Sequence, residues 1–577
     1  MLQIEGSSQL RSAREWAPRA AGALILLLAL GPGGAENVAA APAETSRASG
    51  QLNAFIDDFT VPEDTGRQTD MSAASFAREL QETQRNLGRL RAIDRKGLSV
   101  DEQIDWEFAQ SILRGHEIEQ AQIQTWKRDP RDYMKFNDVA RTVAQPGTPQ
   151  DKAKQLLPIL ELVPTQLANA QRNIEGYIPR FQELSVFMAE GAVSIFEKDV
   201  RAFAATTGAG SQDILAANDA ALEALKTFIA YLKNDLPKKP HGEWAIGKQT
   251  YDAALKDQYL LDYDSDKLYA FATQEFERTV HDLEQVAKRI DPKKTWQQLA
   301  VEIKNEYPPA DKMIEIHQQW VDEARQHVLS KHLIPIPWKE RVQVVPRAEY
   351  LRKYSYYGNF SRARKPDANG VLVGQWQINP FEDQWDEKTR HDYLVEHDYG
   401  VIIVTAPHET YMGHHIQSLY QMHNPRKLRR ANGISIFSEG WGLYNEQLMR
   451  ETGFFPNDRI VLRQLQLRLW RNARVVWDVG IHTGKMTYEQ AISLLSDRVG
   501  FLRWAAQLEV DASAKEPLYR IGYFMGMVEI LRMRAEFHKA MGDEFTLSDF
   551  HERLLKVGNM PPSLMRKGLM ATISGVQ

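Results

Sequence analysis

The sequence HETYMGHH occupies residues 408–415 and is followed by SEGW at residues 438–441. Two neutral imidazoles and one carboxylate can hold a zinc ion and leave one coordination position open for water. A further carboxylate, here Glu409, can take a proton from that water. The two stretches together therefore contain the residue types that a hydrolytic zinc site requires.

The spacing of the histidines departs from the common HExxH pattern, because Met412 occupies the fifth position. In a regular helix, residues four apart lie on one face, about 6 Å apart along the axis. His408 and His414 are six residues apart, which corresponds to roughly 9 Å and to different faces. They can share a metal ion only if the helix is interrupted, and Gly413 is the expected position of that interruption. His415 returns to the same face but lies farther along the axis, so both His414 and His415 remain candidates for the second ligand.

Glu439 is the expected third metal ligand. It follows His414 by 25 residues, on a segment that reads as a second helix. This is the third-ligand arrangement of the glutamate-type zinc peptidases, and it favours a metal site over two polar histidines on an amphipathic helix. We therefore expect one Zn²⁺ ion bound by His408, by His414 or His415, and by Glu439.

The composition of the 577 residues excludes several classes of protein. Charged residues make up 25% and hydrophobic residues 43% of the chain, as in a soluble globular protein. The net charge of −5 lacks the basic excess of nucleic-acid-binding proteins, so no nucleic-acid partner is expected. The absence of cysteine excludes disulfides, cysteine nucleophiles and thiolate metal ligands. Any metal site must therefore be built from His, Asp and Glu.

The N-terminus has the features of an export signal. Three arginines precede an apolar run at residues 20–30, and small residues suited to cleavage follow at residues 34–43. The run is too short for a comfortable membrane span, and no cysteine is available for lipid attachment. We expect residues 1–43 to be a signal peptide and the mature protein to be periplasmic or secreted, without stable membrane insertion. An uncleaved N-terminal anchor is the alternative.

Residues 44–335 are expected to form a helical N-terminal half. Ser99 with Glu102 forms a capping box ahead of an apolar stripe. Thr148 followed by Pro149 is typical of a helix start, with threonine as the N-cap and proline at the first helical position. Such apolar stripes are usually packing faces rather than binding sites.

Residues 236–242 are turn-rich and are the linker candidate within the first half. Residues 336–577 are expected to form the catalytic half. A small β-sheet is expected within residues 342–405, with a turn at Asp367 to Gly370. The stretch from Gln375 to Asn379 is the candidate edge strand along which a substrate backbone could bind, although a purely structural sheet is the alternative. The metal-binding and later helices are expected at residues 409–423, 438–451, 457–483, 487–509 and 517–541.

These motifs together resemble a bacterial family known as domain of unknown function 885 (DUF885), with the pattern HExxPGHHLQ, EGWAxYxE, DxGxH and YxxG. The resemblance covers about Val342 to Leu569. Met412 stands where the family usually has proline, so Gly413 is expected to break the helix alone. The segments that carry the resemblance are HETYMGHHIQ (408–417), SEGWGLYNEQL (438–448), RVVWDVGIHTGKMTYEQAI (474–492) and YRIGYFMGMVEILRMRAEF (519–537).

The same segments are distantly similar to angiotensin-converting enzyme and the thimet-type oligopeptidases. This similarity implies a mainly α, zincin-like (gluzincin) body, with two halves around a deep cleft, the zinc on its floor and a small β-sheet near the metal. It also implies a zinc-dependent hydrolase, most directly a metallopeptidase that cleaves short peptides. A zinc amidohydrolase acting on a non-peptide amide and a catalytically silent helical binding protein are the alternatives. Side-chain preference, exo- or endopeptidase mode and oligomeric state have no signal in the sequence.

The resemblance also implies roles for supporting residues. Glu409 is the expected general base. Tyr523 resembles the tyrosine that stabilises the transition state in the converting-enzyme group, with a core tyrosine as the alternative. His482, in the DVGIH segment, is a candidate hydrogen-bond donor to substrate, with a structural histidine as the alternative. Glu446 is a candidate for orienting a metal-bound imidazole. A substrate carboxylate could be met by Lys515, Tyr519 and Arg520. The alternative is that these side chains are only solvated, as charged residues near a proline usually are.

Overall fold

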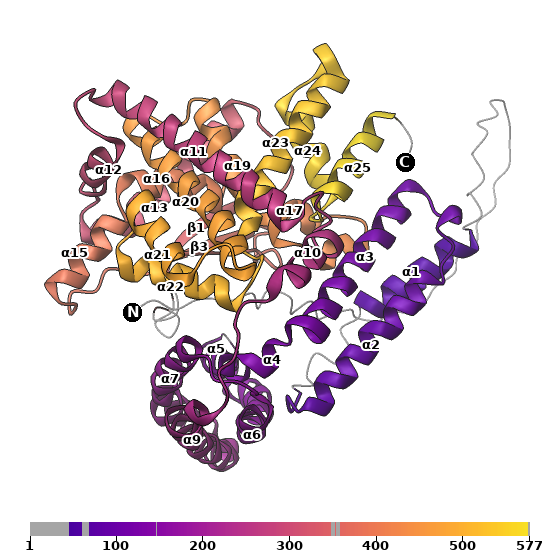
Figure 1. The fold of residues 1–577 in the computed structure, drawn as a ribbon, viewed down its shortest axis with the longest axis vertical. Helices are drawn as coiled ribbons and strands as arrows, with labels where there is room; N and C mark the ends of the chain where they lie inside the picture. The colour runs from indigo at the N-terminus through magenta and orange to yellow at the C-terminus, as the bar shows by residue number, and fades with distance from the viewer. Residues whose placement is uncertain (1–45, 61–68, 146, 348–351, 353–357, 575–577) are drawn as a thin grey trace.

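The computed structural model describes residues 46–60, 69–145, 147–347, 352 and 358–574, which are built mainly from helices with one small sheet (Figure 1). The expected mainly α architecture is confirmed. No helix in these described ranges is long and apolar enough to cross a bilayer. The expected signal peptide, residues 1–43, lies outside the described residues.

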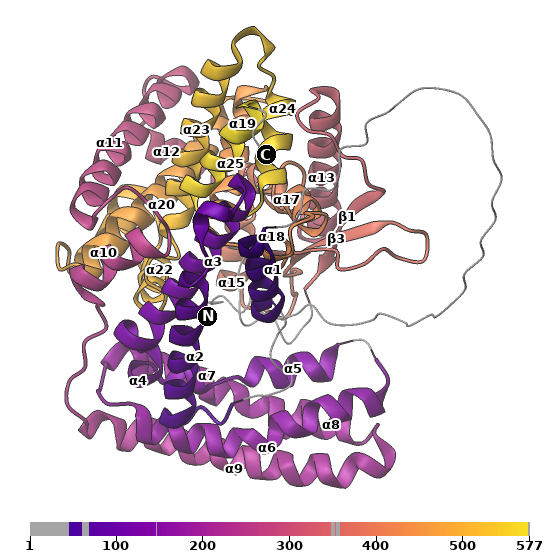
Figure 2. The same ribbon diagram turned by 90° about the vertical axis from the view of Figure 1, so that its right-hand side faces the viewer.

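The helices between Thr125 and Asn234 form a separate bundle beside the main body. Figure 1 shows this bundle end-on, and Figure 2 shows it from the side. It has its own apolar core, in which Leu160 and Leu225 are completely buried. The predicted N-cap at Thr148 is confirmed, because its side chain accepts a hydrogen bond from the backbone N–H of Asp151. The bundle consists of α4 (Thr125–Arg128), α5 (Phe136–Ala144), α6 (Pro149–Asn173), α7 (Pro179–Ser194), α8 (Val200–Ala204) and α9 (Ser211–Asn234).

The main body joins helices from both ends of the sequence. Before the sheet it contains α1 (Arg47–Thr60), α2 (Ala73–Arg91), α3 (Val100–Ile118), α10 (Gly247–Asp257), α11 (Ser265–Ile290), α12 (Trp296–Lys304) and α13 (Met313–Ser330). The helices after the sheet are α15 (Glu387–Glu396), α16 (Tyr399–Glu409), α17 (His414–Met422), α18 (Lys427–Ala431), α19 (Ser435–Glu451), α20 (Asp458–His482), α21 (Tyr488–Ser493), α22 (Arg503–Lys515), α23 (Ile521–Met541), α24 (Leu547–Val557) and α25 (Pro562–Ser574).

The apolar core is not divided at the expected boundary between residues 335 and 336. Leu52 of α1 and Leu113 of α3 belong to the same buried cluster as Phe524 of α23 and Leu569 of α25. Helices α1 and α3 therefore share one apolar core with α23 and α25, although they lie at opposite ends of the sequence. The turn-rich residues 236–242, in contrast, do follow the end of the separate bundle.

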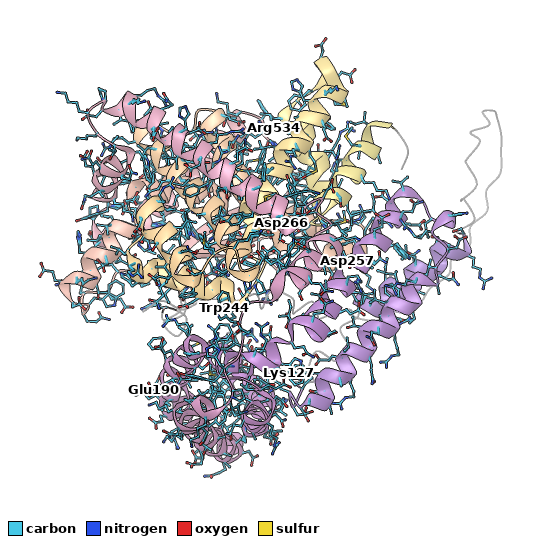
Figure 3. All side chains as sticks on the ribbon, viewed as in Figure 1. Lys127, Glu190, Trp244, Asp257, Asp266 and Arg534 are labelled. Carbon is cyan, nitrogen blue, oxygen red and sulfur yellow. The ribbon has the colours of Figure 1, made fainter. Side chains whose placement is uncertain are left out.

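The bundle and the main body meet at α7 and α22. The Arg180 guanidinium donates to the buried carboxylate of Asp511, with Nε 2.9 Å and Nη2 2.6 Å from its oxygens. Trp244 lies at this junction (Figure 3), where it packs against Ile178 and Phe181 and against the ring of His482. A charged pair and an apolar contact thus hold the bundle beside α22.

The sheet has three strands, β1 (Glu340–Pro346), β2 (Asn359–Ser361) and β3 (Leu372–Ile378), in the order β1-β3-β2. The predicted turn is confirmed by Gly370, which has a φ of +76° and donates to the carbonyl of Asp367. The prediction that Gln375 begins an edge strand is wrong, because β3 is the central strand and Gln375 pairs with both neighbours. The expected strand-rich region is also shorter than predicted, since α15 already begins at Glu387.

Candidate metal centre

His408 and Glu409 form the end of a helix rather than its beginning. Asp398 caps α16 by accepting a hydrogen bond from the N–H of Val401, and the helix ends at Glu409. The prediction of one continuous helix over residues 409–423 is therefore wrong. Glu409 is the last residue of α16, and α17 begins only at His414. Both histidines thus lie at helix ends that face each other.

The break between α16 and α17 involves more than Gly413. Gly413 is required there, because a Cβ atom would overlap the carbonyl of His408. Met412 has a φ of +71°, a left-handed conformation that the ring of proline excludes. The carbonyl of Met412 accepts hydrogen bonds from the Asn445 amide, at 2.6 Å, and from the Trp441 indole. The expectation that Gly413 alone breaks the helix is therefore wrong, since Met412 and two side chains of α19 also define the turn.

Three side chains converge at this break. One ligand atom from each of His408, His414 and Glu439 lies within 4.8 Å of the other two, the one such group found in the described part of the chain. The Glu439 Oε2 atom is 3.8 Å from Nε2 of His408 and 3.6 Å from Nε2 of His414. His414 and Glu439 keep 18% and 15% of their side-chain surface exposed, so solvent reaches one side of the group.

The far nitrogens of both imidazoles face hydrogen-bond acceptors. Nδ1 of His408 lies 2.9 Å from Oε1 of the buried Glu446, and Nδ1 of His414 lies 3.5 Å from Oε1 of Gln417. A proton on each Nδ1 leaves the Nε2 lone pairs free to bind a metal. Gly442 makes this position possible, because a Cβ there would lie 2.5 Å from Cε1 of His408. Glu446 thus lies where it can orient the imidazole of His408.

His415 points away from this group. It is completely buried, and its Nε2 donates to Oε2 of Glu340 at 2.8 Å. The same oxygen of Glu340 accepts a hydrogen bond from the hydroxyl of Tyr411 at 2.7 Å, and Arg325 pairs with the other oxygen. Of the two histidines left open by the sequence, His414 faces Glu439, and His415 ties α17 to strand β1.

Two tyrosines lie beside the group. The hydroxyl of Tyr519 donates to Oε1 of Glu439 at 3.1 Å. The ring of Tyr523 stacks over His408 with 6.4 Å between ring centroids, and burial followed by the charge of Glu439 raises its pKa. Sequence reasoning named Tyr519 only as a possible contact for a carboxylate. Its position one helical turn before Tyr523 was the available signal for a role beside the metal ligands.

His482 lies in the interior, with no contact to the three converging side chains among the described residues. Its Nε2 lies 3.0 Å from the carbonyl oxygen of Ser513, and its ring packs on Trp244 and Tyr251. Burial lowers its pKa, which keeps the imidazole neutral. The expected hydrogen bond from His482 to substrate has no support in this geometry, since the ring is completely buried.

The three converging side chains fit a divalent cation. Zinc bonds of about 2.0–2.2 Å in a tetrahedron imply donor atoms about 3.4 Å apart, slightly less than the observed separations. Although burial lowers it, the nearby carboxylates of Glu439 and Glu446 raise the pKa of His408 to about 10. Burial raises the pKa of Glu439, but the two histidines outweigh it and hold the value well below its usual range. The surroundings thus favour positive charge where the Nε2 atoms meet.

Comparison with known proteins defines the family. A family model described as a bacterial protein of unknown function (DUF885) matches residues 57–569. The chain belongs to the DUF885 family. No functionally curated protein matches it significantly.

Two solved structures share the fold of this DUF885 protein. The first is described as a putative lipoprotein of unknown function from Shewanella oneidensis, with a TM-score of 0.77, 22% identity, and coverage of 90% of this chain and 99% of the other. The second is described as a putative lipoprotein from Colwellia psychrerythraea, with a TM-score of 0.73, 17% identity, and coverage of 92% and 100%. At these identities the likeness shows the fold alone.

Proposed function

We propose that this DUF885 protein is a zinc-dependent hydrolase, and specifically a metallopeptidase that cleaves short peptides. The observation that carries the proposal is the convergence of the His408 and His414 Nε2 atoms on the Glu439 carboxylate, with both Nδ1 atoms turned toward acceptors. Two histidines and one glutamate leave part of the coordination sphere of a zinc ion free. A bound zinc ion would act as a Lewis acid that lowers the pKa of water and polarises a carbonyl group.

Glu409 is the general base in this proposal. It directly follows a metal-ligand candidate, His408, and makes no hydrogen bond or ion pair with another described residue. Burial raises the pKa of its carboxyl group above the usual value and outweighs the neighbouring histidines, which lower it. A carboxylate in this position can take a proton from water and later deliver it to the leaving amine.

The two tyrosines have different roles in this proposal. Burial raises the pKa of Tyr523, so its phenol stays protonated at neutral pH and can donate a hydrogen bond to an oxyanion. Tyr519 already donates to Glu439 and limits how that carboxylate can turn. Tyr523 thus provides the second electrophile that amide hydrolysis requires besides the metal, and Tyr519 positions a metal ligand.

We also infer that the protein works outside the cytoplasm on a short peptide, without nucleic acid or membrane partners. Support comes from the export-signal features of residues 1–43, from the acidic net charge of −5, and from the description of both similar structures as putative lipoproteins. This chain contains no cysteine, so it lacks the residue that carries a lipid in such proteins.

Metal analysis followed by cleavage of a mixed peptide library tests the proposal. Wild type is expected to bind one zinc ion per chain and to cleave peptides. Glu409→Gln is expected to keep the zinc and to lose at least about a thousandfold in kcat/KM, because the base is removed while the ligands remain.

The exposed Glu544 provides a matched control, since Glu544→Gln changes the same functional group away from the site. Zinc binding without cleavage of any peptide by wild type would refute the peptidase assignment. In that case, hydrolysis of non-peptide amides would identify an amidohydrolase, and complete inactivity a binding protein. A wild-type protein without zinc would refute the site itself.

A further inference from the structure

Arg520 has a buried guanidinium that makes no hydrogen bond through Nε or Nη1 within the described part of the chain. It lies between α22 and α23, and only 7% of the residue is exposed. Its ion pair with Glu516 has an N–O distance of 3.6 Å, which is beyond hydrogen-bond length. Because a guanidinium stays protonated in proteins and a buried donor without a partner is destabilising, this arrangement suits an acceptor supplied from outside.

Two more arginines surround the same place. Arg471, Arg474 and Arg520 all act electrostatically on Tyr523. Arg474 is satisfied, since its Nε and Nη2 donate to Glu509 at 3.0 and 3.3 Å. Arg471, which is 7% exposed, donates one long bond of 3.4 Å to a backbone carbonyl, and its Nε has no partner in the described part of the chain. Two of the three guanidiniums, those of Arg471 and Arg520, thus have no hydrogen-bonded carboxylate among the residues that the structure describes.

Arg520 lies one tyrosine ring away from the candidate metal centre. Its Cζ atom is 5.8 Å from the centroid of the Tyr519 ring, and the hydroxyl of that ring donates to Glu439. Arg520 is also the N-cap residue of α23, a helix of 21 residues whose start has no side-chain cap. The positive end of this helix adds to the attraction for an anion.

We propose that Arg520, with Arg471 as a second cation, binds the C-terminal carboxylate of the peptide, so that the protein is a carboxypeptidase. Bidentate binding of a carboxylate is what the planar fork of arginine does best. An extended peptide advances about 3.3–3.6 Å per residue, so one tyrosine ring between the anchor and the metal ligands suits removal of one or two residues. The inference rests on the proposed peptidase function and specifies its substrate.

Peptide pairs that differ only in a free or amidated C-terminus test the inference in the wild-type holoenzyme. Cleavage is expected at a constant distance of one or two residues from a free C-terminus. Amidation is expected to reduce kcat/KM at least about tenfold, mainly through KM, because a charged partner of Arg520 is lost. Cleavage at positions unrelated to the C-terminus, or equal cleavage of acid and amide, would overturn it.

Substitution of Arg520 tests whether this residue causes the preference for a free C-terminus. Arg520→Gln is expected to abolish the difference between acid and amide, and Arg520→Lys to restore part of it. Arg532→Gln is the control, because it makes the same change farther along α23 at a side chain that is 46% exposed. This variant is expected to keep the wild-type preference. An unchanged preference in a folded, zinc-loaded Arg520→Gln variant would contradict the assignment.

Binding separates this inference from the proposed function. Calorimetry of the Glu409→Gln variant, loaded with zinc, would compare N-acetyl hexa-alanine with its C-terminal amide. Tighter binding of the acid supports the anchor even if wild type cleaves nothing, whereas equal binding or no detectable binding of the acid overturns it. A third peptide, amidated at its C-terminus and carrying an Asp or Glu side chain, completes the comparison. If it binds as tightly as the free acid while the plain amide does not, the bound carboxylate is a side chain, which also overturns the C-terminal assignment.

Discussion

A Cβ atom on Gly526 of α23 would lie 2.7 Å from the Cα atom of Gly440 of α19. The two helices therefore cross with their backbones in contact. This contact brings Glu439, the residue before Gly440, close to the start of α23. There the hydroxyl of Tyr519 donates to Glu439, and the ring of Tyr519 packs against that of Tyr523.

Gly526→Ala is expected to force α19 and α23 apart. The new methyl group would overlap the carbonyl of Ile436, and overpacking of this kind costs about 1–3 kcal/mol or more. Zinc affinity should fall with stability, because Glu439 moves with α19. Denaturant unfolding and metal titration measure both effects. Gly88→Ala in α2, where no atom lies within 4 Å, is the control and should stabilise the protein by up to about 1 kcal/mol.

Glu446→Gln is expected to weaken zinc binding about 10–100-fold while the fold is kept. The amide has nearly the volume of the carboxylate but removes the charge that fixes the Nδ1 proton of His408. Competition with a chelator measures the affinity. Glu451→Gln, on the same helix but paired with Arg534, should leave it unchanged. Equal zinc affinity in wild type and Glu446→Gln would contradict the orienting role.

Substitution of the adjacent histidines is expected to give opposite results. His414→Gln should lose most zinc binding with little change in stability, because its Nε2 faces Glu439. His415→Gln should keep zinc but lower the free energy of unfolding by about 1–3 kcal/mol, because Glu340 loses a buried donor. Metal content and denaturant unfolding of both variants provide the test. Loss of zinc in His415→Gln alone would reverse the assignment.

Stability is expected to fall in acid because of His317. Burial, with the nearby His397, lowers the pKa of His317 to about 3 in the folded protein. The unfolded chain, with a histidine pKa of about 6.5, therefore takes up the proton first. The contribution of neutral His317 to the free energy of unfolding is therefore complete above pH 6.5 and is lost as the pH falls toward 3. At pH 5 the loss amounts to about 2 kcal/mol.

His317→Phe removes this titration and keeps an aromatic ring against Trp376. The variant should be less stable than wild type at pH 8, because the bond to the Met313 carbonyl is lost, but should lose less stability between pH 8 and pH 5. Urea unfolding at several pH values measures the slope. Parallel pH profiles for the two proteins would exclude His317 as the cause.

Several features of the fold were predictable because they depend on neighbouring residues. The capping box of Ser99 and Glu102 forms as expected. The helices predicted at 438–451, 457–483 and 517–541 correspond to α19, α20 and α23 within a few residues. The stretch expected as one helix at 487–509 divides into α21 and α22, with Gly500 at a φ of +90° between them.

Local sequence was sufficient for the types of metal ligand and for most of the helices, since caps and apolar periodicity act within a few residues. It did not distinguish His414 from His415, because that choice depends on the turn at Met412, which two side chains of α19 stabilise through its carbonyl. It did not predict that β3 is the central strand or that Arg520 is buried. Strand order and burial are set by contacts between segments far apart in the chain, and these contacts exist only after the main body has packed.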